Sequence, residues 1–287
     1  LIIMTYIHSN AHREETQVLL DSKCVSIALE DITSDNPHRR FPLVANMGEL
    51  AGKGGFLAAC YYAQSVHGGP GILLNNVIGS DAPVISIIGC GYTGMGAAEL
   101  ASAFGCTVRM MDLNFEAMER AQGLLPGNVS FMYSSRAAIE ECLKDSDVII
   151  NCVLWPKTRK DHLIYKEDLK MMKPGAMIID VACDDAGAVE TCKSTTHDDP
   201  VYYVDGILHY AVDNIPSAFS KNSSVRFSCD SLPYALAIAN KGIKQALKDD
   251  RHLRDGLTTF DGKLTLRETA EKFGVEWTNP EDLIKEW

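Results

Sequence analysis

The fold is decided by one stretch of sequence, Val84-Ile-Ser-Ile-Ile-Gly89-Cys-Gly91-Tyr-Thr-Gly94. The apolar run at 84–88 predicts a buried strand, and a helical pattern at 94–104 follows the glycines. In this context the first glycine allows a tight turn, the second lets a pyrophosphate approach the backbone, and the third lets helix and strand pack closely. Free N–H groups at the start of the helix then face the anion. The stretch therefore predicts a dinucleotide-binding turn at Gly89, Gly91 and Gly94.

An acidic residue ends the next predicted strand, which covers 107–111. Asp112 follows this strand about 20 residues after the turn, where a carboxylate can accept hydrogen bonds from the adenosine ribose hydroxyls. The same charge would repel a 2′-phosphate, which favours NAD over NADP. Arg109 has the opposite charge, but it lies inside the strand rather than at its end. We therefore expect NAD as the cofactor.

Strands and helices alternate through the middle of the chain. Each predicted strand is apolar on both faces, which indicates a parallel sheet covered on both sides. The expected fold class is thus α/β, with a Rossmann-type doubly wound parallel sheet. The predicted strands are 84–88, 107–111, 129–132, 147–150 and 176–181, and the predicted helices are 94–104, 115–124, 136–143 and 167–172.

The flanking segments are expected to form a second, discontinuous substrate domain. Its N-terminal piece is 1–42 and its C-terminal, helical piece is 222–287, with the NAD-binding domain and a linker helix inserted at 43–221. In the C-terminal piece, apolar spacing predicts helices at 230–247 and 264–273. The chain begins in a strand-like run without an initial Met, so we expect the natural chain to start earlier and this domain to be incomplete.

A helix-compatible segment at 47–66 links the two predicted domains. It contains several glycines, which cost stability inside a helix unless a neighbouring element packs closely against that face. A helix over this segment is therefore expected to need close packing against its glycine-bearing face.

The composition is that of an ordinary globular protein. The 287 residues are 46% hydrophobic and 23% charged, and the net charge is −11. An acidic chain has no electrostatic preference for nucleic acid or an anionic membrane, and no apolar run is long enough to cross a bilayer. The 9 cysteines are odd in number and lack C-x-x-C spacing, which favours a reducing, cytoplasmic location over a disulfide framework or a zinc site.

Carboxylates and histidines supply the candidate chemistry. Asp180, Asp184 and Asp185 follow the strand at 176–181, at the sheet edge where doubly wound folds bind ligands. One of them could move a proton beside the cofactor, whereas any single Asp is more commonly a turn or cap residue, and spacing does not choose among the three. His8 follows a predicted strand at 1–7. No histidine has metal-ligand spacing, so no metal is predicted.

Short motifs spread through almost the whole chain resemble those of the alanine dehydrogenase family, which also contains the pyridine-nucleotide transhydrogenase α-subunit. They occur in the same order as in that family. The motifs are Thr5-Tyr-Ile-His8, Met47-Gly-Glu-Leu-Ala-Gly52, Gly68-Gly-Pro-Gly-Ile-Leu-Leu74, Gly89-x-Gly-x-x-Gly94, Val153-Leu-x-Pro156, Met172-Lys-Pro-Gly175, Ile179-Asp-Val-Ala182, Thr195-Thr-His-Asp-Asp-Pro200, His209-Tyr-Ala-Val212, Asn214-x-Pro216, Leu232-Pro-Tyr-Ala-Leu236 and Ala239-Asn-Lys-Gly242.

This resemblance implies a reaction and a set of roles. The reaction is the reversible oxidative deamination of L-alanine, in which alanine, NAD and water give pyruvate, ammonium and NADH. His8 matches the catalytic histidine that hydrogen-bonds the reacting centre, and Asp184 matches the catalytic aspartate that handles water and protons. The family also implies a homo-oligomer, a hexamer built from dimers. The positions that match cofactor-binding residues are Gly89, Gly91, Gly94, Asp112, Ser134, Val153, Leu154, Asn214 and Ile215.

Departures from the family pattern keep two alternatives open. In the family, an arginine and a lysine that hold the substrate precede the segment matched here, and neither is in this sequence. Asp213 and the segment 217–221 resemble the related N-carboxyalkyl amino acid (opine-type) synthases, which join pyruvate to an amino-acid amine. A non-catalytic NAD-binding remnant is the third hypothesis. A transhydrogenase subunit is disfavoured because that system needs membrane partners.

Overall fold

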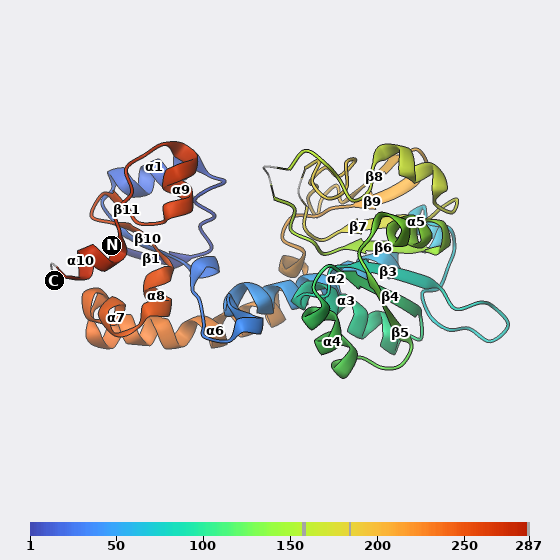
Figure 1. Ribbon diagram of the computed structural model, residues 1–287, viewed down its shortest axis with the longest axis horizontal. Coiled ribbons are helices and arrows are strands. Elements are labelled where there is room, and N and C mark those ends of the chain that lie inside the picture. Colours follow the sequence, from blue (N-terminus) through green and yellow to red (C-terminus); the bar gives the residue numbers. More distant parts are fainter. Residues whose placement is uncertain (157–158, 184, 286–287) are drawn as a thin grey trace. The chain divides into compact units, whose positions relative to one another are not determined.

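The computed structural model describes residues 1–156, 159–183 and 185–285 and forms two compact units (Figure 1). The smaller unit is made of Leu1–Asn46 and Ser224–Trp287, and the larger unit is Met47–Ser223. The chain passes between the units inside two long helices, α2 (Pro42–Tyr62) and α6 (Ser220–Lys241).

The larger unit is built on a seven-stranded sheet with the order β5-β4-β3-β6-β7-β9-β8. All neighbours are parallel except β8 and β9, which form an antiparallel hairpin at one edge. The predicted parallel α/β sheet is confirmed. The strands are β3 (Val84–Ile88), β4 (Thr107–Asp112), β5 (Val129–Tyr133), β6 (Val148–Asn151), β7 (Met177–Asp180), β8 (Val201–Val204) and β9 (Ile207–Tyr210).

The strand order reverses between β3 and β6, because the chain builds outward from β3 to β5 and then returns to the other side of β3. In doubly wound sheets, such a switch point opens a crevice beyond the carboxyl ends of the strands, and ligands bind there. The fold therefore places its binding crevice where β3 and β6 end.

Helices cover both faces of this sheet. Alternate residues of one strand enter different apolar cores: Ile85 and Ile87 pack in the core that contains Phe56 of α2, whereas Ile88 packs in the core that contains Ile139 of α5. Helices α4 and α5 begin with side-chain caps; Asn114, for example, accepts hydrogen bonds from two backbone N–H groups of α4. Besides α2, the helices of the larger unit are α3 (Tyr92–Ala103), α4 (Phe115–Leu124), α5 (Arg136–Asp145) and the 3₁₀ helices η3 (Ser65–His67), η4 (Lys166–Met171) and η5 (Ile215–Phe219).

The smaller unit has a four-stranded sheet with the order β1-β2-β10-β11. Strand β1 is parallel to β2, and β10 pairs antiparallel with both β2 and β11. Its elements are β1 (Ile2–Thr5), α1 (Arg13–Asp21), β2 (Val25–Ala28), η1 (Leu29–Asp31), η2 (Pro37–Arg39), α7 (Ile243–Asp249), α8 (Arg251–Asp255), β10 (Leu257–Phe260), β11 (Lys263–Leu264), α9 (Arg267–Phe273) and α10 (Pro280–Lys285).

Two predicted helices of the C-terminal segment differ from the structure. The helix predicted at 230–247 is divided, because Gly242 has a φ of 76° and separates α6 from α7. The helix predicted at 264–273 begins only at Arg267, because Leu264 belongs to β11. The strand β10 was not predicted, since its four residues carry no alternating pattern and are held by pairing with the distant β2.

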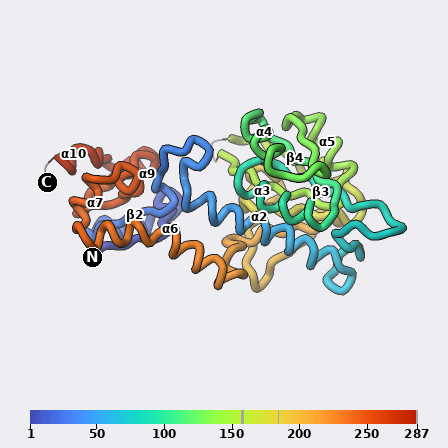
Figure 2. The backbone as a smooth tube through the Cα atoms, turned by 90° about the horizontal axis from the view of Figure 1, so that it is seen from below, coloured from blue at the N-terminus to red at the C-terminus, as the bar shows by residue number. Residues whose placement is uncertain are grey.

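Glycines bring α2 into close contact with α3 (Figure 2). A Cβ atom on Gly52 would overlap the carbonyl oxygen of Thr93, and one on Gly96 would overlap that of Glu49. The close contact predicted for this glycine-rich helix is therefore present, and it fixes the helix that opens directly after the glycine turn.

Replacing Gly52 with alanine is expected to lower the free energy of unfolding by about 3 kcal/mol, because the new methyl group has no room against the backbone of Thr93. Gly123, in α4, is the matched control: a Cβ there meets no heavy atom within 4 Å. Gly123→Ala should stabilise by about 0.5–1 kcal/mol through helix propensity. Urea unfolding followed by circular dichroism measures both; equal effects of the two substitutions would contradict the tight helix contact.

Candidate active site

The glycine turn between β3 and α3 has the geometry that a diphosphate requires. Gly89 has a φ of 104°, which favours glycine. A Cβ on Gly94 would overlap the carbonyl oxygen of Gly89, so helix and turn touch there. In contrast, a Cβ on Gly91 would meet no heavy atom within 4 Å, so the backbone faces open space at the helix N-terminus. Of the three glycines, Gly91 is thus the one that leaves room for a ligand.

Asp112 lies beside this turn. Its Oδ2 accepts a hydrogen bond from the backbone N–H of Cys90 (2.7 Å), and its Oδ1 accepts one from the backbone N–H of Asn114 (2.9 Å). The backbone N–H of Ser134, just after β5, donates to the carbonyl oxygen of Asp112 (2.9 Å). The ends of β3, β4 and β5 therefore bring the turn, Asp112 and Ser134 to one edge of the sheet.

The ends of β6 and β7 are joined by two buried polar side chains. Asn151 and Asp180 are paired in the register of these strands, and the Nδ2 of Asn151 donates to the Oδ1 of Asp180 (2.9 Å). The same oxygen accepts hydrogen bonds from the backbone N–H groups of Ala182 and Cys183, both at 3.2 Å. Asp180 therefore shapes the start of the loop after β7. Sequence reasoning did not select Asn151 as a site residue. The signal that could have identified it is a polar residue directly after an apolar strand.

Val153 and Leu154 follow β6 at the switch point. The backbone N–H of Val153 donates to the Oδ1 of Asn151 (3.3 Å), and its side chain lies 3.2 Å from the position of a Cβ on Gly89. Leu154 is 80% exposed. An apolar wall thus stands next to the glycine turn, as a nicotinamide or ribose face would need.

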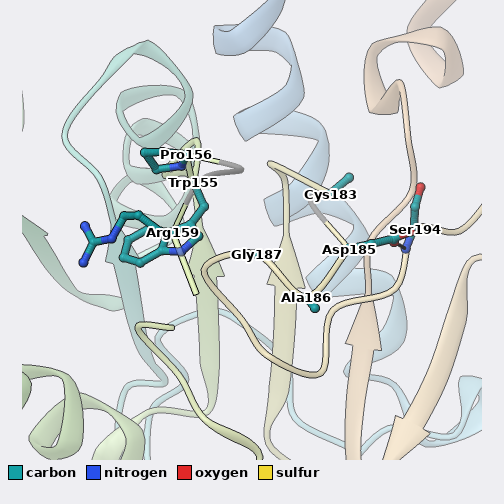
Figure 3. A pocket seen from close by; sticks show the side chains of 8 residues that line it. All are labelled: Trp155, Pro156, Arg159, Cys183, Asp185, Ala186, Gly187 and Ser194. Carbon is teal, nitrogen blue, oxygen red and sulfur yellow. Dashed lines mark hydrogen bonds between the residues drawn. The ribbon is translucent and has the colours of Figure 1, made fainter. Parts of the chain in front are cut away.

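A cavity of about 400 Å³ opens between the loops that follow β6 and β7 (Figure 3). Asp184 lies outside the described residues, whereas its chain neighbours Cys183 and Asp185 line this cavity. The Oδ1 of Asp185 accepts a hydrogen bond from the backbone N–H of Ser194 (2.6 Å), which anchors that side chain within the loop. The residues lining the cavity are Trp155, Pro156, Arg159, Cys183, Asp185, Ala186, Gly187 and Ser194.

The loop after β6 contacts the loop after β7 on the two sides of this cavity. The Nδ1 of His162 lies 2.7 Å from the carbonyl oxygen of Gly187, and the Nε1 of Trp155 donates to the carbonyl oxygen of Asp161 (2.7 Å). The guanidinium of Arg159 stacks on the Trp155 ring, 4.1 Å from its centroid. Sequence reasoning did not single out Trp155, Arg159 or His162, because Trp155 is the variable position of the motif at 153–156 and the other two lie in a loop without periodicity.

Asn214 and Ile215 follow β9 and occupy different environments. Asn214 has a φ of 59°, and its carbonyl oxygen accepts hydrogen bonds from the backbone N–H and the hydroxyl of Ser217. Ile215 is 2% exposed and packs in the apolar core against Gly54 of α2. The side chain of Ile215 therefore contributes to the core rather than to an open surface.

Thiols around the crevice are held neutral by burial. Burial raises the pKa of Cys90 to about 12 and raises the pKa of Cys152 and of Cys192 as well. Burial also lowers the pKa of His209, whose ring nitrogens face the hydroxyl of Thr191 and the carbonyl of Ile207. These groups are structural, because thiolate reactivity requires a lowered pKa.

His8 belongs to the smaller unit, where it follows β1. Its backbone has a φ of 47°, and its side chain is 60% exposed. The Nδ1 of His8 lies 3.9 Å from the Oε1 of Glu30, which is only 11% exposed. Asp31 is next to Glu30, and burial, together with the charges of Glu30 and Glu268, raises the pKa of Asp31 to about 7.

The raised pKa of Asp31 predicts a pH-dependent stability. The folded protein favours the neutral acid, so this stabilisation is complete below about pH 4 and is lost as the pH rises through about 7. Asp31→Asn should therefore be more stable than the wild type at pH 8 and equal to it at pH 4. Urea unfolding at both pH values measures this, with Asp261→Asn in the β10–β11 turn as the control. A constant difference at both pH values would contradict the prediction.

Among the described residues, no three His, Cys, Asp or Glu side chains are grouped so that they could hold a metal ion. The described helices likewise include none that is long and apolar enough to cross a membrane.

Comparison with known proteins identifies the family. Residues 55–267 match the family described as "Alanine dehydrogenase/PNT, C-terminal domain". The chain belongs to the alanine dehydrogenase/PNT family. The alanine dehydrogenase of Staphylococcus haemolyticus is 39% identical over 287 residues, which cover 100% of this chain and 76% of that relative.

Two solved structures share the fold of this chain. A structure titled L-alanine dehydrogenase matches with a TM-score of 0.89 and 33% identity, covering 95% of this chain and 75% of that one. The transhydrogenase from Sinorhizobium meliloti matches with a TM-score of 0.77 at 17% identity, covering 92% and 75%, and this likeness concerns the fold alone.

Proposed function

We propose that this protein is an NAD-dependent alanine dehydrogenase. It converts L-alanine, NAD and water to pyruvate, ammonium, NADH and a proton, and it catalyses the reverse reaction. The observation that carries the proposal is the 39% identity to an alanine dehydrogenase over the entire chain. The topology supports it, because the glycine turn after β3 and the loop after β7 that lines the cavity both follow the carboxyl ends of parallel strands, where doubly wound sheets bind ligands.

The residues at the crevice fit NAD. The open space at Gly91 and the N–H groups at the start of α3 suit the diphosphate. Asp112 suits the ribose hydroxyls, and Val153 and Leu154 offer an apolar wall. When bound, NAD supplies the hydride acceptor. Ser134, Asn214 and Ile215 complete the proposed cofactor-binding set.

Two groups are proposed to do the acid–base work. Asp184 takes a proton from the water that adds to the imine, and His8 donates a hydrogen bond to the oxygen or nitrogen on the reacting carbon. The buried pair of Asn151 and Asp180 holds the start of the loop after β7, the loop in which Asp184 follows in sequence.

A direct assay tests the function. NADH oxidation is followed with pyruvate and ammonium, and then with pyruvate and individual amino acids. The proposal expects turnover with ammonium. Turnover with an amino acid alone would instead support the opine-type synthase, and NADH binding without any turnover would support a non-catalytic protein.

Asp112→Asn tests the cofactor preference. The loss of the charge should raise the Kd for NADH about tenfold, because a charge-assisted hydrogen bond to ribose is weakened. The Kd for NADPH should fall, because the repulsion of its 2′-phosphate is removed. Fluorescence titration measures both constants, with Asp205→Asn in the β8–β9 turn as the control. Equal changes for the two nucleotides would argue against Asp112 as the ribose ligand.

We further propose a homo-oligomer, with the hexamer of the family as the expected state, and a reducing, cytoplasmic location. The family resemblance carries the homo-oligomer, and the odd number of cysteines without C-x-x-C spacing supports the reducing location. Light scattering on the purified chain measures the assembly.

A further inference from the structure

A buried carboxylate holds the backbone that presents His8. Glu30, in η1, accepts hydrogen bonds from the backbone N–H of Ile7 through both oxygens, at 3.0 and 3.2 Å, and another from the backbone N–H of His8. Its Oε1 also lies 3.9 Å from the Nδ1 of His8. Among the described residues, the basic side chain paired with Glu30 is the imidazole of His8, and no Lys or Arg forms an ion pair with it.

The turn around His8 is fixed from several sides. His8 has a φ of 47°, a conformation that costs a non-glycine residue energy and persists only where its surroundings enforce it. The hydroxyls of Ser9 and Thr269 are 2.7 Å apart, and the side chain of Asn10 donates to Glu268 (2.9 Å). Strain held this firmly at an exposed side chain is typical of a functional position.

The ring itself is also oriented. Tyr6 stacks on the His8 ring, with centroids 6.2 Å apart and the two planes 12° apart. Since Nδ1 lies on the side of Glu30, Nε2 is the ring nitrogen left for a ligand. The charges of Glu30 and Glu268 both act on the carboxyl group of Asp31, and the neutral form of Asp31 that burial favours limits the negative charge there.

We propose that Glu30 is the positioning residue for His8: it holds the ring with the Nδ1–H facing the carboxylate and balances the charge of the imidazolium. This inference rests on the proposed function. A carboxylate behind a histidine fixes the tautomer and supports the ring when it carries a proton. The separation of 3.9 Å exceeds a hydrogen bond, and such contacts often tighten when substrate binds.

Glu30→Gln is the informative variant, because the amide oxygen can still accept from the two backbone N–H groups while the charge is lost. It should lower kcat for reductive amination about 10- to 100-fold and leave the Kd for NADH unchanged. Glu268→Gln is the matched control, because it removes a carboxylate that bonds the same turn through Asn10 but does not contact His8. It should change kcat less than about threefold.

A double-mutant cycle separates positioning from a general structural role. If Glu30 acts through His8, then Glu30→Gln should cost nothing further in a His8→Asn background. Losses that multiply in the double variant, or a Glu30→Gln enzyme with wild-type kcat, would overturn the proposal. A His8→Asn enzyme with full turnover would instead overturn the role given to His8 in the proposed function.

A spectroscopic readout is independent of turnover. The ¹⁵N shifts of the His8 ring distinguish its two neutral tautomers, and the wild type should be mainly the Nδ1–H form. Glu30→Gln should move the ring toward the Nε2–H form, whereas Glu268→Gln should not. The same tautomer population in the wild type and in Glu30→Gln would refute the contact between Glu30 and the His8 ring. This outcome does not depend on which reaction the protein catalyses.

Discussion

The Asp184→Asn enzyme is expected to have a kcat at least about 10³-fold lower than the wild type, with a Kd for NADH within about twofold of it. The amide cannot take a proton from water, yet it has nearly the same size and polarity as the carboxylic acid. General acid–base catalysis contributes factors of this order, and cofactor affinity depends on the glycine turn and Asp112 instead.

Asp185→Asn is the matched control for this experiment. The Oδ1 of Asp185 accepts from the backbone N–H of Ser194, and an amide oxygen can do the same. Its kcat should therefore stay within about tenfold of the wild type. Loss of NADH binding in Asp184→Asn would show that Asp184 serves the cofactor or the fold. A larger loss of kcat in Asp185→Asn would transfer the proton-handling role to that neighbour.

Substitution of two glycines in one motif is expected to give opposite phenotypes. Gly91→Ala should unfold at the wild-type urea concentration, because its Cβ enters open space, but its Kd for NADH should rise about 100-fold as the methyl group takes the place of the diphosphate. Gly94→Ala should lose about 3 kcal/mol of stability, because its Cβ overlaps the carbonyl oxygen of Gly89.

Both variants are measured by urea unfolding and by NADH fluorescence titration at a temperature where each is folded. A Gly91→Ala protein that binds NADH as well as the wild type would place the diphosphate elsewhere. A Gly94→Ala protein of normal stability would mean that helix α3 can shift away from the turn without cost.

Local pattern was sufficient for the parallel strands β3 to β7 and for the glycine turn, but not for the antiparallel edge formed by β8 and β9. The predicted β3 and α4 have the bounds of the structure, because an apolar run and an Asn cap with helical spacing are local signals. Strand β10 required its pairing with β2, which lies more than 200 residues away in sequence, and no local signal reports such a contact. The break at Gly242 depends on a positive φ that glycine permits but does not require.

The candidate site was also predictable only as far as local sequence signals reach. Glycine spacing and Asp112 identified the turn, and the structure places them together. Spacing alone left Asp180, Asp184 and Asp185 equivalent, because their roles depend on cross-strand register; the register now assigns Asp180 to Asn151. The contact between Glu30 and His8 joins two short segments through a strained turn, and sequence patterns carry no information on that geometry.

The division of the central sheet between two apolar cores has a consequence for how this sequence can diverge. Ile85 and Ile87 share neighbours on one side, and Ile88 has its neighbours on the other. A change of side-chain volume at one of these isoleucines can therefore be compensated only by residues of the same apolar core. Homologous sequences should show two separate sets of co-varying positions, interleaved residue by residue along each strand.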